Sequence, residues 1–370
     1  MENKQIRILQ YIGSLNIGGS QSMIMEIYRK IDKSKIQFDF IIDRKNETLY
    51  EDEILKLGGR VYKFNSCFKG YNIIQFKKEW NNFFKKHKEY KIIHCHVRSV
   101  ASIVLKIAKK YGLTTICHSH STSNGKGVKS YIKRKLQKRI VKYADYLFAC
   151  SIDSAKWLYG EKMSQTNRCI IINNAIDTGK YLYNEETRNR VRKNFNFNDK
   201  IVLGQVGRLE EVKNYNFSID LLSELVKRNS KYMLLIIGAG SLKDVIVDKI
   251  GKLNLKNNVL LLENRNDVNE LMQAMDVFLM PSLWEGLPLA LVEAQAASLP
   301  CIISENISDG ILVDDIVSKL SIDLIDEWVK KVEEISSTLK TRNDFTEIIK
   351  SKGFDIKNNV EIISKFYLSL

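Results

Sequence analysis

Two cationic residues follow a run that has the composition of a buried strand. The segment 204–214, GQVGRLEEVKN, places Arg208 and Lys213 after the strand and beside Gly207, where the missing side chain permits close backbone approach. Two cations at this position can hold a diphosphate and neutralise the charge that grows on it as it leaves. The plain alternative is that both residues are ordinary surface salt-bridge partners.

Two carboxylates stand eight positions apart in the segment 281–296, PSLWEGLPLALVEAQA. A loop turns at Gly286 and Leu287, and the helix expected from residue 288 would aim free N–H groups at an anion such as a diphosphate. Glu293 lies in an otherwise apolar, small-residue helix, where a buried carboxylate needs a polar partner such as a ribose hydroxyl. Glu285 can accept from the hydroxyls of a sugar ring. The alternative for Glu293 is a solvated position on a surface helix.

Glycines mark two further loops that can approach a phosphate. Gly18 and Gly19 follow the strand expected at 6–12 and open a helix, and Gly238 begins a GAG loop after the strand expected at 232–237. Neither loop matches the GxGxxG pattern, so neither supports a nicotinamide or flavin site. The sequence therefore implies no cofactor.

Histidines stand in two pairs, His94 with His96 and His118 with His120, on different expected strands. Strand alternation puts both members of a pair on one face. Zinc ligation is an alternative that we weigh and do not adopt, because the His/Cys spacings typical of zinc sites are absent. The chain also has no Asp-x-Asp. We expect no metal, and we leave open whether His118 or His120 belongs to the site.

The stretch 126–143 carries eight Lys or Arg residues and no acid, with apolar residues four apart along one face. It predicts a basic amphipathic helix, which is either an exposed helix with its stripe on the core or a surface that binds anionic lipid. Nucleic acid is not expected, because aromatic base-stacking residues beside the charges are few. The cations expected to face acceptor or membrane are Lys129, Lys133, Arg134, Lys138 and Arg139.

The elements that must position these residues alternate between short strands and longer amphipathic stretches, which is typical of parallel α/β sheets. The expected strands are 6–12, 37–42, 60–64, 91–96, 114–118, 146–150 and 169–172, and then, after a turn-like segment, 201–206, 232–237, 259–262, 277–280 and 301–303. We predict an N-terminal domain over 1–178, a C-terminal domain over 179–352, and a C-terminal helix at 353–370 that packs back on the first domain.

Composition sets the class of protein. The 370 residues are 44% apolar and 27% charged, which is ordinary for a globular protein, and no run is long and apolar enough for a membrane span. The six cysteines lack CxxC spacing and favour a reducing cytoplasm. The net charge of +15 is concentrated in the first half of the chain, which therefore faces an anionic partner.

The GRLEEVKN block, the Glu-x7-Glu spacing from Glu285 to Glu293, and the NAID junction at 174–177 together resemble the retaining glycosyltransferases of family 4, which have the GT-B fold. The resemblance covers nearly the whole chain. It implies two Rossmann-like doubly wound α/β domains facing across a cleft, with the nucleotide-sugar donor held mainly by the second domain and the acceptor mainly by the first. Family members usually have Gly where Ala175 stands, which is a mild departure.

Carried onto this sequence, the resemblance assigns Arg208 and Lys213 to the donor diphosphate, Glu293 to its ribose, and Glu285 with the following backbone to the transferred sugar. It places His120 near that sugar and its phosphate, and Gly238 below the nucleotide.

We therefore predict a metal-independent retaining glycosyltransferase that moves a sugar from a UDP-sugar to a sugar hydroxyl on a lipid-linked acceptor. Its expected setting is bacterial capsular polysaccharide or exopolysaccharide assembly, at the inner face of the cell membrane. The alternatives are a UDP-sugar epimerase of the same architecture and a non-catalytic protein that binds lipid or nucleic acid.

Overall fold

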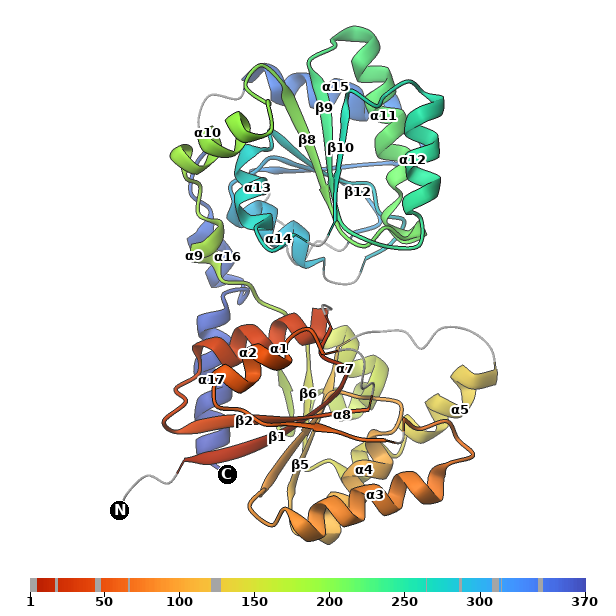
Figure 1. Ribbon diagram of the computed structural model, residues 1–370, viewed down its shortest axis with the longest axis vertical. Coiled ribbons are helices and arrows are strands. Elements are labelled where there is room, and N and C mark those ends of the chain that lie inside the picture. Colours follow the sequence, from red (N-terminus) through yellow and green to blue (C-terminus); the bar gives the residue numbers. More distant parts are fainter. Residues whose placement is uncertain are drawn as a thin grey trace. The chain divides into compact units, whose positions relative to one another are not determined.

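The structure is a computed structural model that describes residues 5–16, 19–43, 48–65, 67–120, 128–263, 265–285, 288–307, 313, 315–338 and 342–370. The chain divides into two compact units. The N-terminal unit holds residues 1–175 and 356–370, and the C-terminal unit holds residues 176–355. Each unit is built around its own parallel sheet (Figure 1).

The N-terminal unit contains a seven-stranded sheet in the order β3-β2-β1-β4-β5-β6-β7. Its strands are β1 (Ile6–Gly13), β2 (Ile36–Ile42), β3 (Val61–Lys63), β4 (Ile92–Cys95), β5 (Thr114–Ser119), β6 (Tyr146–Ala149) and β7 (Cys169–Ile171). Its helices are α1 (Gly19–Lys30), α2 (Glu51–Lys56), α3 (Ile73–Lys86), α4 (Ala101–Lys110), α5 (Val128–Gln137), α6 (Ile140–Tyr143), α7 (Ile152–Tyr159), α8 (Glu161–Ser164) and α17 (Ile356–Leu368).

Helices cover both faces of this sheet because alternate strand residues are apolar on each side. One face packs against α3, α4 and α7 around the buried ring of Trp80. The other packs against α1, α2 and α17, where Tyr28 and Tyr367 are buried.

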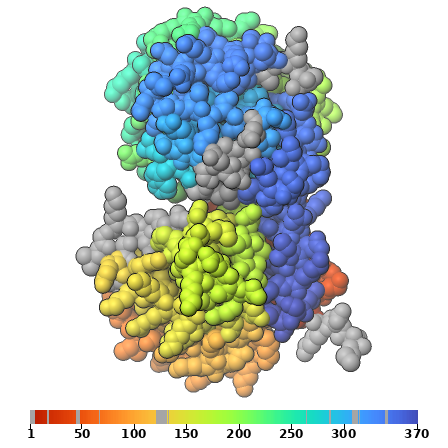
Figure 2. All heavy atoms as spheres, turned by 180° about the vertical axis from the view of Figure 1, so that it is seen from behind, coloured from red at the N-terminus to blue at the C-terminus, as the bar shows by residue number. Residues whose placement is uncertain are grey.

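Helix α17 comes from the C-terminal end of the chain yet lies along α1 and β2 (Figure 1). Figure 2 shows the blue C-terminal spheres beside the yellow-green part of the same unit, where Phe366 contacts the rings of Tyr146 and Phe148. Helix α17 therefore completes a core made otherwise by the first 175 residues.

An ion pair with a buried carboxylate joins β1 and β2 of this sheet. Asp39 of β2 is fully buried, and Arg7 of β1 donates two N–H groups to its carboxylate, each at 2.6 Å. The Tyr90 hydroxyl and the Arg60 backbone N–H donate to the same carboxylate at 2.7 Å each. The four donors replace the hydration that Asp39 loses on folding.

The C-terminal unit contains a six-stranded sheet in the order β10-β9-β8-β11-β12-β13. Its strands are β8 (Ile201–Val206), β9 (Tyr232–Ile237), β10 (Val259–Leu262), β11 (Val277–Met280), β12 (Cys301–Ser304) and β13 (Val317–Leu320). Its helices are α9 (Thr178–Tyr181), α10 (Glu185–Asn194), a 3-10 turn η1 (Glu211–Lys213), α11 (Tyr215–Arg228), α12 (Lys243–Lys252), α13 (Val268–Ala274), α14 (Leu289–Ala296), α15 (Ile325–Thr338) and α16 (Thr346–Ser351).

The helices again form two layers, with α13 and α14 on one face and α11, α12 and α15 on the other (Figure 1). Two Rossmann-like units of this kind match the predicted α/β architecture, which is therefore confirmed. Two details differ from the expectation. The edge strand β13 was not predicted, because its Ser318 and Lys319 interrupt the apolar run. The basic stretch forms α5 and α6 rather than one helix, with a turn at residues 138–139.

Candidate functional site

The loops after β8 and β9 pack backbone against backbone at the carboxyl edge of the C-terminal sheet. A Cβ atom at Gly238 would lie 1.8 Å from the carbonyl oxygen of Gly207, and one at Gly240 would lie 2.5 Å from that of Leu209. The Leu209 N–H also donates to the Ala239 carbonyl at 3.0 Å. Only glycine fits at positions 238 and 240, because any side chain would displace backbone atoms.

Lys213 and Glu285 meet beside Gly207. The Lys213 Nζ atom donates to Glu285 Oε1 at 2.5 Å, and the two side chains are only 17% and 15% exposed. A Cβ atom at Gly207 would lie 3.0 Å from Lys213 Cε, so the lysine stem runs along the glycine. The Ser282 hydroxyl donates to the same Oε1 atom at 3.1 Å. Gly207, Lys213 and Glu285, three of the predicted site residues, therefore form one cluster, although Glu285 lies 72 positions after Lys213.

Hydrogen bonds to backbone carbonyls fix this cluster. The Leu283 N–H donates to the Val212 carbonyl at 2.9 Å, which joins the loop after β11 to the turn η1. The Tyr215 hydroxyl donates to the Gly207 carbonyl at 2.7 Å. Gln205 Nε2 donates to the Lys213 carbonyl at 2.7 Å, which ties the turn back to the strand β8. The position of Lys213 is thus set by three neighbouring segments.

Arg208 is not part of this cluster. Its side chain is 75% exposed and pairs with Glu210. An exposed pair of this kind contributes about 0–1 kcal/mol, so Arg208 can exchange Glu210 for an incoming anion at little cost. Glu293 lies half-buried in α14, among buried neighbours that include Val292 and Ala294. Gly18, Gly286 and Leu287 lie outside the described residues.

In the N-terminal unit, Gly19 is the first residue of α1, and a Cβ atom there would meet nothing within 4 Å. The position has room beside it, as the predicted approach of a phosphate or an acceptor requires.

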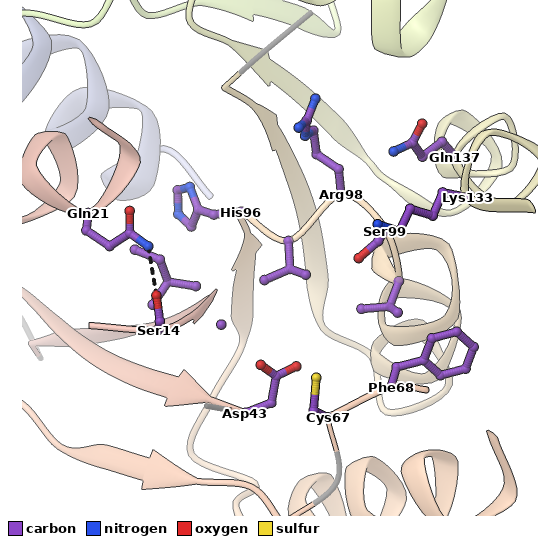
Figure 3. Close-up of a pocket in the computed structure, with 14 residues that line it drawn as sticks. Ser14, Gln21, Asp43, Cys67, Phe68, His96, Arg98, Ser99, Lys133 and Gln137 are labelled. Carbon is purple, nitrogen blue, oxygen red and sulfur yellow. Dashed lines mark hydrogen bonds between the residues drawn. The ribbon is translucent and has the colours of Figure 1, made fainter. Parts of the chain in front are cut away.

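A pocket of about 370 Å³ lies at the carboxyl edge of the N-terminal sheet (Figure 3). Segments that follow β1, β2, β3 and β4 meet helices α1 and α5 there, as expected for a parallel sheet. Its polar lining is Ser14, Gln21, Asp43, Cys67, His96, Arg98, Ser99, Lys133 and Gln137. Most of these residues were not singled out from the sequence. Asp43 and Arg98 could have been, because Asp43 directly follows the buried strand β2 and Arg98 is the third residue after the buried strand β4.

The pocket combines a carboxylate with cations. The Tyr11 hydroxyl donates to Asp43 at 2.8 Å. The Arg98 guanidinium lies 5.2 Å from the ring centroid of Trp157, and burial lowers the pKa of this arginine. Of the predicted acceptor-side cations, Lys133 lines the pocket, and Arg134 stacks on the same Trp157 ring at 4.7 Å. The site therefore suits a ligand that carries both hydroxyls and negative charge.

The other predicted cations of this group lie elsewhere. Lys138 is exposed, and Arg139 lines a second hollow of about 230 Å³ beside α3 and α4. The Lys129 side chain lies outside the described residues.

The four predicted histidines form a stacked row on one face of β4 and β5. Ring centroids lie 4.4 Å apart for His94 and His96, 5.1 Å for His96 and His120, and 4.0 Å for His118 and His120. Burial is the main cause that lowers the pKa of His94, His96 and His118 well below the usual range, and it lowers the pKa of His120 to about 3. The row is therefore uncharged at neutral pH.

The row is poorly arranged for a metal ion. His94, His96 and His118 bring one ligand atom each within 4.8 Å of one another. Their ring planes lie within 17–37° of parallel, so the in-plane lone pairs run side by side rather than toward one point. Ligand atoms on one zinc would stand about 3.3 Å apart. That the chain needs no metal stays a prediction.

Within the described part of the chain, no helix combines the length and the apolar character that crossing a bilayer requires.

Each of the two units matches a known family of proteins. Residues 17–180 match the model of Glycosyltransferase Family 4, and residues 186–352 match Glycosyl transferases group 1. Glycosyltransferase EpsF of Bacillus subtilis is 32% identical over 99% of this chain and 97% of its own length. The capsular polysaccharide biosynthesis glycosyltransferase CapH of Staphylococcus aureus is 22% identical over 98% of this chain and 99% of its own length.

Solved structures agree with the fold. HepE of Anabaena, crystallised with UDP and glucose, superposes with a TM-score of 0.77 at 18% identity, over 99% of this chain and 100% of that one. A glycosyltransferase from Rickettsia africae gives a TM-score of 0.79 at 16% identity, over 98% of each chain. The chain belongs to the family 4 glycosyltransferases, which have the GT-B fold.

Proposed function

We propose that this glycosyltransferase moves a sugar from a UDP-sugar to a hydroxyl of a lipid-linked saccharide, with retention at the anomeric carbon and without a metal ion. The setting we propose is capsular or exopolysaccharide assembly at the cytoplasmic face of the membrane. The observation that carries the donor assignment is the half-buried Lys213–Glu285 pair beside Gly207.

The pair has unused hydrogen-bonding capacity on both partners. An ammonium group has three N–H donors, and Lys213 uses one of them on Glu285. The other two can bind phosphate oxygens of the donor and neutralise the departing diphosphate. Glu285 receives hydrogens from Lys213 and Ser282 on Oε1 alone, so within the described residues its Oε2 atom has no donor. That oxygen can accept from a hydroxyl of the transferred sugar.

The remaining donor contacts extend this cluster. Arg208 leaves Glu210 for the diphosphate, the N-terminus of α14 adds backbone N–H donors, and Glu293 accepts from the ribose. UDP as the nucleotide is supported by the UDP complexes of HepE. It is supported further by an Escherichia coli relative named as a UDP-Gal:alpha-D-GlcNAc-diphosphoundecaprenol alpha-1,3-galactosyltransferase, which is 28% identical over 77% of each chain.

The acceptor pocket we propose is the hollow of the N-terminal unit. Asp43 can accept from acceptor hydroxyls, while Arg98 and Lys133 can bind its phosphate groups. The name of the Escherichia coli relative contains an acceptor of this kind, a saccharide on a diphosphate-linked lipid.

The membrane-facing surface that we propose lies on the same unit. Exposed apolar side chains accompany the basic helix, with Tyr71, Ile74 and Tyr131 being 82%, 81% and 70% exposed. The hollow beside α3 and α4 has an apolar floor with Ile103 and Ile107, and its rim carries the cations Lys77, Lys106, Lys110 and Arg139. An apolar floor inside a basic rim suits anionic lipid, to which each nearby cation contributes about 1 kcal/mol.

The proposal is tested with purified full-length chain. Thermal denaturation is followed with a panel of UDP-, GDP- and ADP-sugars. A donor at 100 times its dissociation constant should add about 2.7 kcal/mol of stability. Transfer to a diphospholipid-linked sugar is then assayed with a chelator present, and the anomeric configuration of the product is read by NMR. A shift by UDP-sugars and a retained configuration support the proposal. An inverted product, a chelator-sensitive reaction, or epimer formed without acceptor contradicts it.

Membrane binding is tested separately by flotation with anionic and with neutral vesicles. We expect salt-sensitive flotation with anionic vesicles only, weakened by the double substitution Lys138→Glu and Arg139→Glu. The same charge change on the C-terminal unit, Lys227→Glu with Lys252→Glu, is the matched control and should leave flotation unchanged. Equal loss in both variants would contradict the assigned surface.

A further inference from the structure

A continuous chain of hydrogen bonds runs through the buried histidine row. His120 Nε2 and His96 Nδ1 are 2.8 Å apart, and His96 Nε2 is 2.9 Å from Gln10 Oε1. Gln10 Nε2 donates to the Tyr367 hydroxyl at 3.3 Å, and that hydroxyl is 2.6 Å from His94 Nδ1. Five side chains are thereby linked, from a proposed sugar-binding residue to the last helix.

The topology explains why these residues meet. Strand β1 pairs with β4, which sets Gln10 opposite His94. Strand β4 pairs with β5, where His118 and then His120, the residue after the strand, continue the row. Helix α17 closes this face of the sheet and supplies Tyr367, which is 2% exposed. His96 also lines the proposed acceptor pocket. The chain of hydrogen bonds therefore connects that pocket to a helix from the far end of the sequence.

Hydrogen-bond valence restricts the protonation of this chain. A neutral imidazole has one N–H donor and one acceptor nitrogen. Since Gln10 Oε1 can only accept, His96 carries its hydrogen on Nε2, and its Nδ1 atom is an acceptor. The bond to His120 then requires a hydrogen on His120 Nε2. His96 and His120 are thus obliged to adopt the same tautomer, with the hydrogen on Nε2 in both rings.

The far end of the chain obeys the same rule. Gln10 Nε2 uses the Tyr367 oxygen as acceptor, so the Tyr367 hydroxyl hydrogen is directed to His94 Nδ1. Reversing the Gln10 amide would reverse every bond and put the hydrogen on Nδ1 in all three histidines. The Gln10 side chain is therefore the element that selects between the two tautomers.

The surroundings keep the row neutral. Arg98 is the cation that acts on His120, and it disfavours a second positive charge there. The neighbouring histidines His94, His96 and His118 act on one another in the same direction. Within the described residues, His120 Nδ1 is buried and has no hydrogen-bond partner. In the tautomer that Gln10 selects, this atom is an acceptor.

We propose that Gln10 and Tyr367 are positioning residues, which hold His96 and His120 in the Nε2–H tautomer so that His120 Nδ1 accepts from a hydroxyl of the bound sugar. The tautomer part stands on the hydrogen-bond geometry alone, and the sugar contact rests on the proposed function. The ligand class at Nδ1 is a hydrogen-bond donor such as a hydroxyl, because an acceptor nitrogen repels an ionised phosphate oxygen.

The tautomers can be read directly by NMR. The chain has five histidines, so long-range ¹H–¹⁵N spectra of protein labelled with [¹⁵N]histidine contain few imidazole signals. At neutral pH we expect His94, His96 and His120 to show the Nε2–H pattern. In Gln10→Met, which keeps the length of the side chain but cannot hydrogen-bond as an amide does, His96 and His120 should become mixtures. Wild-type rings in the Nδ1–H form, in unlike tautomers, or unaffected by Gln10→Met would overturn the proposal.

A second measurement separates positioning from folding. Tyr367→Phe removes the hydroxyl that orients the Gln10 amide, whereas Tyr28→Phe removes a comparable bond, from Tyr28 to Gln37 Oε1 at 2.7 Å, on the same side of the sheet. We expect Tyr367→Phe to shift the tautomers and to lower sugar transfer about 10-fold, which is the size of effect that the loss of one hydrogen bond can have. Tyr28→Phe should change neither. Equal effects of both variants would show a merely structural role.

Nucleotide binding separates a failure of the positioning role from a failure of the proposed function. UDP has no transferred sugar, so its dissociation constant should be unchanged in Gln10→Met, while that of the UDP-sugar rises. Loss of UDP affinity in Gln10→Met would contradict the assigned role. If the wild type bound no UDP at all, the proposed function would fail, whereas the tautomer assignment would still be decided by the NMR spectra.

Discussion

The stacked histidines should make the N-terminal unit sensitive to acid. Four imidazoles, those of His94, His96, His118 and His120, are buried in one row with their pKa values lowered, mainly by burial. In the unfolded chain each histidine takes up a proton below about pH 6.5. In the folded chain the same rings stay neutral until a much lower pH. The unfolded state therefore binds more protons, and stability falls as the pH falls below 6.5.

The loss of stability at low pH can be calculated for His120, whose pKa is lowered to about 3. Between about pH 6.5 and pH 3 this ring alone lowers the free energy of unfolding by about 1.4 kcal/mol for each pH unit. At pH 5 the loss is about 2 kcal/mol, and it is absent above pH 7. The other three histidines act in the same direction, so the wild-type loss should exceed the contribution of His120.

Buried cysteines allow the two units to be followed separately in the full-length chain. Cys95 and Cys117 lie on β4 and β5 beside the histidines, whereas Cys301 is buried in the C-terminal unit. After equilibration in urea at pH 7 and at pH 5, a brief pulse of thiol reagent and peptide mass spectrometry report the unfolding of each unit. The labelling midpoint of Cys95 and Cys117 should move to lower urea at pH 5 by more than that of Cys301.

The variant His120→Gln supplies the control, because glutamine does not titrate. Its N-terminal unit should lose about 2 kcal/mol less stability than the wild type between pH 7 and pH 5. Equal losses in the wild type and the variant would refute the reasoning, as would a wild-type midpoint that is the same at both pH values.

Gly238→Ala tests the packing that shapes the donor site, with Gly251→Ala as its control, and Asp39→Asn tests the ion pair of the N-terminal sheet. Gly238→Ala should destabilise the C-terminal unit and abolish UDP binding, since its Cβ atom would lie 1.8 Å from the Gly207 carbonyl oxygen. The control is Gly251→Ala on α12, where a Cβ atom has room, and this substitution should raise stability by up to about 1 kcal/mol. Thermal melts with and without UDP check this, and a normal melt for Gly238→Ala would contradict it. Asp39→Asn should cost about 3–5 kcal/mol because it leaves Arg7 without its buried partner. Urea unfolding measures this cost, and a loss below 1 kcal/mol would argue against the pair.

The sequence carries much of the architecture because the strands are short, apolar and regularly spaced. The runs at 201–206 and 232–237 have the composition of buried parallel strands, and the structure has β8 and β9 at those residues. The missed strand, β13, lies at the edge of its sheet and is less apolar. Pairing with β12 holds this segment as a strand, although its composition does not indicate one.

Part of the donor cluster could be predicted from the sequence for a similar reason. Gly207, Lys213 and Glu285 come after strands that are adjacent in the sheet, so the carboxyl-edge rule places them near one another. The exposed position of Arg208 could not be predicted from its place after β8, because the side chain pairs with its neighbour Glu210 and not with the cluster. The sequence also gives no means of finding Tyr367, which meets residue 10 across 357 positions and only through the return of α17 to the N-terminal unit.

The most direct test of the donor assignment is calorimetric titration of UDP-glucose and UDP-galactose into wild type, Lys213→Ala and Lys227→Ala. Lys227 pairs with Glu224 on the exposed side of α11 and serves as the matched control. Removing Lys213 deletes a charge-assisted contact to phosphate and leaves the Glu285 carboxylate facing the diphosphate. Its dissociation constant for whichever donor the wild type binds should rise about 10- to 100-fold, with Lys227→Ala unchanged. Wild-type affinity in Lys213→Ala would contradict the account.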